Sequence, residues 1–174
     1  PLPFGSKACP VLAPDNAAAD LALLEESVRQ AGTIARSFFG GAFKRWDQGN
    51  GNPVTEADLA IDKFLSEHLR AARPEYGWLS EETEDDTSRL SARAVFVVDP
   101  IDGTVAFMNQ RPHFTPCAGL VRIGIPVAGA VSNPLTDACF LAPAAPAALP
   151  NVHPIFALYP GRFAPLLLPP PQPL

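Results

Sequence analysis

The stretch from Val97 to Thr104, Val-Val-Asp-Pro-Ile-Asp-Gly-Thr, contains the residues best suited to chemistry in this chain. The apolar run 94–98 predicts a buried strand, and we expect Pro100 to end it because proline cannot donate to a sheet ladder. Asp99 and Asp102 lie three residues apart. Carboxylates at a strand end can hold a hard divalent cation, and a helix that starts at the Gly-Thr pair can offer N–H groups to an anion. The alternative is a loop in which the aspartates only form Asx turns.

A third carboxylate, Glu81, follows the short strand predicted for residues 76–80. It opens the run 81–86, which has five acids in six positions and otherwise reads as a solvated acidic loop. If the two strands are neighbours, Glu81 and Asp99 leave the sheet at the same edge. Three carboxylates held together there would repel one another unless a cation neutralised them. The sequence therefore predicts a Mg²⁺ site, which substrate phosphate and water would complete.

Asp58 has two interpretations. The segment 53–58, Pro-Val-Thr-Glu-Ala-Asp, predicts the start of a helix, in which Thr55 and Asp58 have the spacing of a capping box. Asp58 then either supports the helix N-terminus and its dipole, or points into the acidic site and orients a water molecule or the Thr104 hydroxyl. The two roles are compatible, because a carboxylate at a helix start is held rigidly.

Two amphipathic helices and a sheet must position these residues. The first helix begins near Asp15 or Asn16, either of which could cap it, and ends at Gly40-Gly41. Its apolar face comprises Leu21, Leu24, Val28, Ala31, Ala35 and Phe38. The second ends before Pro74, and its apolar face comprises Leu59, Ile61, Phe64, Leu65 and Leu69. Strands at 115–123, 127–131 and 138–142 predict an antiparallel meander. The predicted fold class is α+β, with two helices packed on an antiparallel or mixed sheet.

Composition narrows the functional class. The 174 residues favour one domain, and the net charge of −5 argues against a nucleic-acid polymer as partner. A small anionic substrate remains compatible, since bound cations would reverse the local field. No apolar stretch is long enough to span a bilayer. Cys9, Cys117 and Cys139 lack metal-binding spacing, so we expect reduced thiols and a cytoplasmic protein.

Three motifs, in order, resemble the inositol monophosphatase family: Pro53–Asp58, Gly77–Glu82 and Val98–Phe107. The resemblance runs from about residue 17 to about residue 142. It implies a Mg²⁺-dependent, lithium-sensitive phosphomonoesterase that hydrolyses a small phosphorylated metabolite. It also implies the first half of a layered αβαβα sandwich and, as the usual state of the family, a homodimer.

The same resemblance implies a role for each site residue. The implied metal ligands are Glu81, Asp99, Asp102 and the backbone carbonyl of Ile101, with Asp99 bridging two ions. The implied phosphate-binding residues are Asp102, Gly103 and Thr104. Glu81 would also help to activate the attacking water, and the Thr104 hydroxyl and Asp58 would act as a pair beside that water.

Residues after Ala142 depart from the family pattern. The segment 143–174 is rich in Pro, Ala and Leu and contains ten of the 21 prolines. It has no Trp-Asp motif, which in the family supplies an additional metal ligand, and no Asp or Glu follows Asp137. We expect an irregular N-terminal segment at 1–14, the family-like domain at 15–142, and an irregular tail at 143–174 that results from truncation or a shifted reading frame.

The substrate is left open by the sequence. Val105-Ala106-Phe107 stands where inositol phosphatases commonly have Thr-Asn-Phe, which weakens the assignment to inositol monophosphate. A 3′(2′),5′-bisphosphate nucleotide and histidinol phosphate are the alternatives within the family. A different class of function is a catalytically inert fragment that retains a weak Mg²⁺ or phosphate site.

Overall fold

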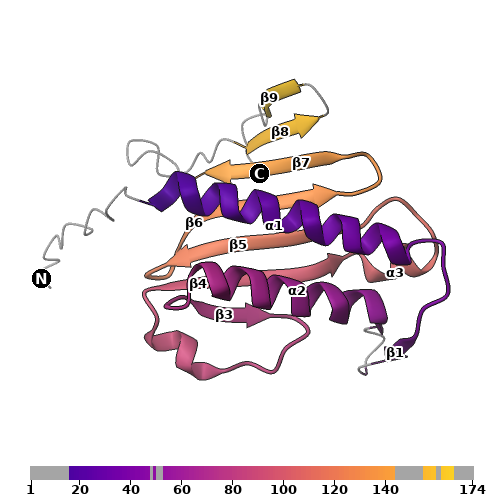
Figure 1. Cartoon of the computed structure of the whole chain (residues 1–174), viewed down its shortest axis with the longest axis horizontal. Helices are drawn as coiled ribbons and strands as arrows, with labels where there is room; N and C mark the ends of the chain where they lie inside the picture. The colour runs from indigo at the N-terminus through magenta and orange to yellow at the C-terminus, as the bar shows by residue number, and fades with distance from the viewer. Residues whose placement is uncertain (1–15, 48, 50–52, 144–154, 160–161, 167–174) are drawn as a thin grey trace, which may run out of the picture.

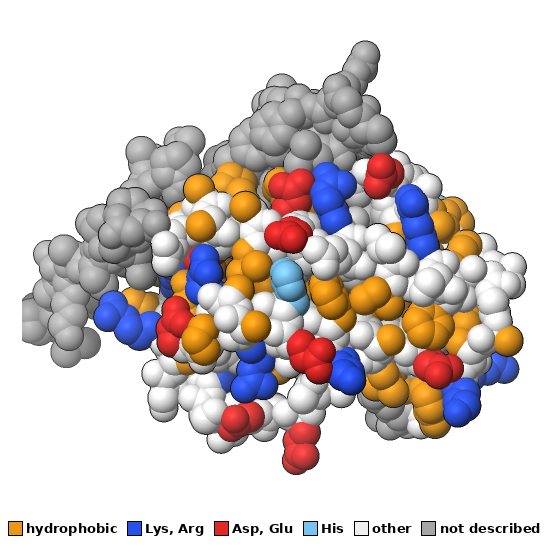
Figure 2. All heavy atoms as spheres, viewed as in Figure 1, with side chains coloured by type: hydrophobic (Ala, Val, Ile, Leu, Met, Phe, Trp, Pro, Cys, Tyr) orange, Lys and Arg blue, Asp and Glu red, His pale blue; other side chains and the backbone are white. Residues whose placement is uncertain are grey.

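The computed structural model describes residues 16–47, 49, 53–143, 155–159 and 162–166. Helices α1 (Ala17–Phe38) and α2 (Glu56–Ala72) lie side by side on one face of a seven-stranded sheet (Figure 1). On the molecular face seen from this side, acidic, basic and hydrophobic side chains are interspersed (Figure 2). The arrangement of the helices on the sheet confirms the predicted α+β class. No helix in the described ranges is long and apolar enough to cross a membrane.

The order of the strands across the sheet is the same as their order along the chain. Only the first two strands are joined by a crossover connection. Its strands are β3 (Gly77–Ser80), β4 (Ala94–Asp102), β5 (Thr115–Arg122), β6 (Ile125–Asn133), β7 (Ala138–Pro143), β8 (Ile155–Tyr159) and β9 (Arg162–Leu166). Strands β3 and β4 are parallel, whereas every later neighbouring pair is antiparallel. The predicted meander is therefore confirmed. The remaining elements are the hairpin of β1 (Arg45–Asp47) and β2 (Pro53–Thr55), the 3₁₀ helix η2 (Thr87–Ser91) and the short helix α3 (Thr104–Met108).

Helix α1 buries the predicted apolar stripe. Leu24, Val28, Ala31 and Ala35 are fully buried, and the helix packs on the central strands and on α2. The stripe recurs every three or four residues, so one face of the helix can cover the sheet. Asn16 occupies the N-cap position, but its side chain makes no capping hydrogen bond, contrary to the expected cap. Asp15, the other candidate cap, lies outside the described residues.

Helix α2 begins with the predicted capping box. The Thr55 side chain accepts from the Asp58 N–H, and the Asp58 side chain accepts from the Thr55 N–H. Ile61, Leu65 and Leu69 are fully buried against the sheet. The prediction that Leu59 belongs to this apolar face is wrong. Leu59 is 42% exposed, because it lies about 200° around the helix from Ile61 in a structure of about 3.6 residues per turn.

Strand β4 continues past Pro100, contrary to the prediction that this residue ends it. Asp99 pairs with Cys117, but Asp102 pairs with Thr115, so three steps along β4 oppose two along β5. The extra residue forms a bulge, and a bulge is one of the places where a sheet tolerates proline. The bulge keeps both aspartates on the strand while changing the direction of the chain between them.

The described residues after β7 add two strands to the sheet. Strand β8 pairs antiparallel with β7, and β9 pairs antiparallel with β8, so the described part of 143–174 extends the sheet. Residues 144–154, 160–161 and 167–174, like the predicted irregular segment 1–14, lie outside the described residues.

The sheet face opposite the two helices carries an apolar hollow. Phe96, Val98 and Leu120 point to the helices and are buried, so their strand neighbours point to the other face. The hollow has a volume of about 440 Å³. It extends from Asp99 across β5, β6 and β7, and its lining includes Val97, Cys117, Gly119, Val131, Phe140 and Ala142.

Candidate active site

Parallel pairing of β3 and β4 brings two of the predicted carboxylates together. Ser80 pairs with Val98, so Glu81, the first residue after β3, follows the strand at the level of Asp99 in β4. The Glu81 N–H donates to the Val98 carbonyl over 3.4 Å, which continues the ladder by one bond. The prediction that these two strands are neighbours is confirmed. The apolar run of β4 is buried on its helix side, and a buried strand needs a hydrogen-bonding partner along each edge.

Asp99 lies at the centre of the acidic residues. Burial, together with the negative charges of Glu81, Asp102 and Asp58, raises the pKa of Asp99 to about 6. A hydrogen bond from the Ile101 backbone opposes the rise in pKa. Glu81, which follows β3, Asp102 on β4 and Asp58 on α2 thus all contribute to the electrostatic environment of Asp99.

The β4 bulge and Gly103 turn the chain sharply after the second aspartate. Asp102 is exposed, and Gly103 has a positive φ of 92°. A Cβ atom at Gly103 would lie only 2.5 Å from the backbone carbonyl oxygen of His113. Both the backbone conformation and the available space therefore require glycine at the start of α3.

Thr104 connects the acidic strand end to α2. Its hydroxyl lies 3.3 Å from Oδ1 of Asp58 and 3.0 Å from the Ile101 carbonyl oxygen. A hydroxyl has one proton and donates to one of these acceptors at a time. The carbonyl oxygen of Ile101 has two lone pairs, so a bond from Thr104 leaves one available.

Asp58 makes both contacts that the sequence proposed as alternatives. Its Oδ2 accepts from the Thr55 N–H at 2.8 Å and from the Thr55 hydroxyl, while Oδ1 faces Thr104. The side chain is 1% exposed, and burial raises the pKa of Asp58 although these hydrogen bonds act to lower it. The carboxylate is therefore fixed in one orientation, with one oxygen in the helix cap and one directed at Thr104.

The profile of the inositol monophosphatase family matches residues 17–151, well over half of the 174 residues. The chain belongs to the inositol monophosphatase family. The match runs beyond Ala142, where the motifs placed the end of the resemblance.

Individual relatives agree with this membership. The 3′(2′),5′-bisphosphate nucleotidase CysQ of Aggregatibacter actinomycetemcomitans is 34% identical over 119 residues, covering 67% of this chain and 44% of that protein. Inositol-1-monophosphatase of Rhizobium meliloti (strain 1021) is 38% identical over 95 residues, covering 55% of this chain and 35% of that protein.

Solved structures share the fold. The extragenic suppressor protein suhB from Bartonella henselae superposes with a TM-score of 0.69 at 27% identity, covering 81% of this chain and 52% of that one. The chain thus spans about a third to a half of the length of these relatives.

Family members act on small phosphorylated substrates and are generally metal-dependent. Whether the acidic residues around Asp99 suit a metal depends on the donor atoms that they offer. Within the described ranges, no three His, Cys, Asp or Glu side chains are already gathered into a metal cage. The groups around Asp99 are nevertheless almost all oxygen donors, which suit a hard cation. The exception is Cys117, and burial together with Asp99 and Asp102 raises the pKa of its thiol to about 11. A protonated thiol does not compete as a ligand, so the donor set fits Mg²⁺.

Two buried or half-buried carboxylates of this family member were not singled out from the sequence. Asp62 on α2 accepts hydrogen bonds from the Ser80 hydroxyl and, at 2.7 Å, from the Thr83 hydroxyl. Its spacing of four residues from Asp58, on the same helix face, was the available signal.

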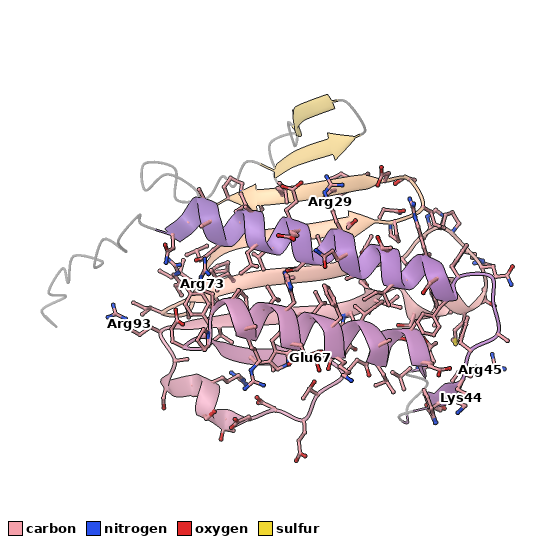
Figure 3. The ribbon with its side chains drawn as sticks, viewed as in Figure 1. Arg29, Lys44, Arg45, Glu67, Arg73 and Arg93 are labelled. Atoms are coloured by element: carbon pink, nitrogen blue, oxygen red, sulfur yellow. The ribbon has the colours of Figure 1, made fainter. Side chains whose placement is uncertain are left out.

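Asp20 on α1 is the other overlooked carboxylate. It is 1% exposed and accepts from the Arg122 guanidinium, from Arg73 Nε at 2.9 Å and from the Tyr76 hydroxyl at 3.2 Å. Arg73 is labelled in Figure 3, near the N-terminal end of α1. These partners come from two parts of the chain, residues 73–76 and Arg122, that lie far from Asp20 in sequence, so no local pattern could have indicated them.

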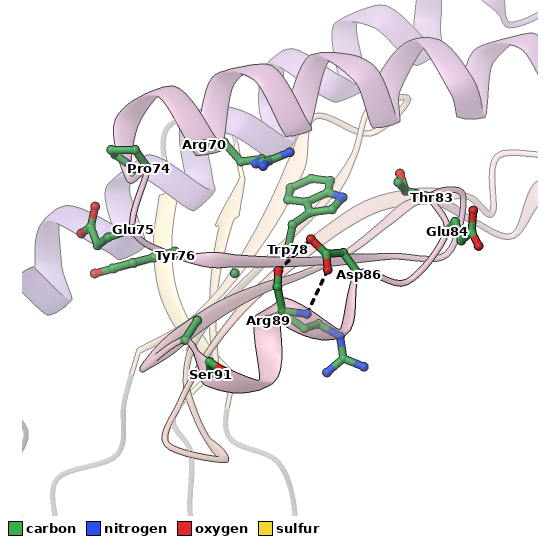
Figure 4. Close-up of a pocket in the computed structure, with 13 residues that line it drawn as sticks. Arg70, Pro74, Glu75, Tyr76, Trp78, Thr83, Glu84, Asp86, Arg89 and Ser91 are labelled. Atoms are coloured by element: carbon green, nitrogen blue, oxygen red, sulfur yellow. Dashed lines mark hydrogen bonds between the residues drawn. The ribbon is translucent and has the colours of Figure 1, made fainter.

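A separate pocket of about 440 Å³ lies at the outer edge of β3 (Figure 4). Residues from the end of α2, from β3 and from 83–92 line it, including Arg70, Trp78, Asp86 and Arg89. Glu81, Asp99 and the other acidic-site residues are not among its lining residues. The pocket is therefore distinct from the candidate active site. The guanidinium of Arg89 in its lining donates two hydrogen bonds, of 2.6 and 2.7 Å, to the Asp85 carboxylate.

Proposed function

We propose that this protein is a Mg²⁺-dependent phosphomonoesterase that hydrolyses a small phosphorylated metabolite. The observation that carries the proposal is the electrostatic environment of Asp99, whose pKa rises to about 6 because its carboxyl is partly buried and is subject to the negative charges of Glu81, Asp102 and Asp58. Such a cluster destabilises the fold unless a cation neutralises it, and perturbed carboxylates of this kind gather at functional sites.

The proposed metal ligands are Glu81, Asp99, Asp102 and the Ile101 carbonyl. Mg²⁺ held there would lower the pKa of a coordinated water and neutralise the charge of the phosphoryl oxygens. Family membership and the oxygen-rich donor set support this assignment.

The protein residues themselves would orient the attacking water and the phosphate. The Thr104 hydroxyl would donate to Asp58 Oδ1, 3.3 Å away, and its oxygen would accept a hydrogen bond from the water. Asp58 would fix the direction of that hydroxyl, and Glu81 would receive the proton that the water releases. The backbone N–H groups of Gly103 and Thr104, together with Asp102 through the cation, would hold the phosphate.

The substrate remains within three candidates. A nucleotidase and an inositol-1-monophosphatase are both among the relatives, so a 3′(2′),5′-bisphosphate nucleotide and inositol monophosphate stand beside histidinol phosphate. Homodimer formation, lithium sensitivity and a cytoplasmic location also stay predictions.

A catalytically inert protein that binds Mg²⁺ or phosphate weakly is the second candidate. It is favoured by one observation: among the described residues, no three His, Cys, Asp or Glu side chains are already gathered around one metal position.

Phosphate release from the three substrates, with Mg²⁺ and with EDTA, tests the proposal. We expect release that requires Mg²⁺ and that Asp99→Asn abolishes. Glu67→Gln is the matched control, because Glu67 is an exposed carboxylate that pairs only weakly with Lys63 (Figure 3). Absence of release from folded wild-type protein, with Mg²⁺ binding retained, would instead establish the inert binding protein.

A further inference from the structure

Asp62 occupies an unusual place between α2 and the acidic loop. Its Oδ1 accepts from the Ser80 hydroxyl and its Oδ2 accepts from the Thr83 hydroxyl at 2.7 Å. Ser80 is 7% exposed and also accepts from the Glu82 N–H at 3.3 Å. Glu81 therefore lies inside a short segment that one carboxylate holds at both ends.

The spacing along α2 relates this contact to the rest of the site. Asp58 and Asp62 are one helical turn apart on the same face. Asp58 faces Thr104, just after β4, whereas Asp62 binds the end of β3. One rigid helix thus contacts both strand ends from which Glu81 and Asp99 emerge.

A carboxylate suits this position better than an amide. Two hydroxyl groups donate to two different oxygens of Asp62, whereas asparagine has one acceptor oxygen. A further negative charge close to an acidic loop is electrostatically unfavourable, so its presence is explained by the two hydrogen bonds that it accepts.

We propose that Asp62 is a positioning residue that holds residues 80–83 against α2 and so directs Glu81 toward Asp99 for metal binding. This inference rests on the proposed function for the metal and on the observed hydrogen bonds for the positioning. It predicts that loss of Asp62 frees the loop even without metal, and that it weakens Mg²⁺ binding without removing any ligand.

The first measurement is amide hydrogen exchange of Glu81 and Glu82 in the metal-free protein. We expect faster exchange in Asp62→Ala, an intermediate rate in Asp62→Asn, and the wild-type rate in the control Glu67→Ala. Thr83→Ala removes a single exposed hydroxyl and provides a milder variant should Asp62→Ala fail to fold. Unchanged exchange in folded Asp62→Ala, or in folded Thr83→Ala if only that variant folds, would overturn the proposal.

The second measurement is Mg²⁺ affinity by calorimetry. We expect the dissociation constant to rise about 10-fold in Asp62→Ala, as is typical when a partner of a metal ligand is lost, and to stay at the wild-type value in Glu67→Ala. Faster exchange with unchanged Mg²⁺ affinity would overturn the link between the loop and the metal. Wild-type protein that binds no Mg²⁺ would refute the proposed function, and the exchange rates alone would then decide whether Asp62 positions the loop.

Discussion

At the scale of single residues, Asp99 combines a chemical role with a cost in stability. Its pKa is about 6 in the folded protein and about 4 in an unfolded chain. Between these values the folded state binds more protons than the unfolded state. The contribution of Asp99 to stability is therefore fully present below about pH 4 and is lost as the pH rises through about 6.

Asp99→Asn is accordingly expected to stabilise the metal-free protein at neutral pH while abolishing phosphate release. The gain in the free energy of unfolding should be on the order of 1–2 kcal/mol at pH 7.5, because the amide keeps the hydrogen bond from Ile101 but removes the charge. It should nearly vanish at pH 4. Urea denaturation of both proteins at the two pH values checks this, and an equal gain at both would contradict the assigned cause.

Gly103 gives a second prediction at this scale. Gly103→Ala places a methyl group against the His113 carbonyl in a backbone conformation with φ of 92°. We expect a loss of more than about 1 kcal/mol in the free energy of unfolding, and weaker substrate binding because α3 must shift. Gly124→Ala is the matched control, since Gly124 also has a positive φ, 75°, but open space around it. A similar loss in both variants would mean that backbone strain alone matters.

At the scale of elements, the start of α2 serves both the helix and the site. Thr55 is fully buried, and its hydroxyl and N–H both contact Asp58. Thr55→Val keeps the shape but removes the cap, so we expect a loss of about 1–2 kcal/mol in unfolding free energy. The same measurement on Thr33→Val, an exposed hydroxyl on α1, should show a change within about 0.5 kcal/mol. Comparable effects in the two variants would argue against the cap.

The motifs predicted which elements hold the site, but not how one strand bends there. Periodicity indicated both helices and the meander because burial on one face dictates it. Pro100 was expected to end β4, since a local rule cannot tell that β5 supplies a partner beyond the bulge.

At the scale of the whole molecule, Asp20 joins distant parts of the chain. Asp20→Ala would leave Arg73 and Arg122 partly buried without their carboxylate. We expect a loss of about 3–5 kcal/mol in unfolding free energy. Glu25→Ala, which breaks the more exposed pair with Arg29, should cost less than about 1 kcal/mol. Thermal denaturation of both variants tests this, and equal melting temperatures would refute a structural role for the cluster.

The acids of the candidate site could be predicted because they lie at the ends of β3 and β4, two strands that are consecutive along the chain. The residues that support it were not, because they depend on long-range geometry. Asp62 meets residues 18 and 21 positions away, and Asp20 meets partners up to 102 positions away. Apart from the four-residue spacing between Asp58 and Asp62, nothing in the local sequence distinguishes Asp62 and Asp20 from ordinary acids on a helix surface.

The parallel pairing of β3 with β4 also has a consequence for folding kinetics. Strands β5 to β7 are joined by hairpin loops of two and four residues, which close quickly, whereas β3 joins its parallel partner β4 through the longer crossover 81–93. We expect the meander to form first and β3 to dock after the folding transition state. The carboxylates would then meet only late, and their repulsion would act mainly on the unfolding rate. A cation bound at this edge would consequently lengthen the lifetime of the native state while leaving the refolding rate nearly unchanged.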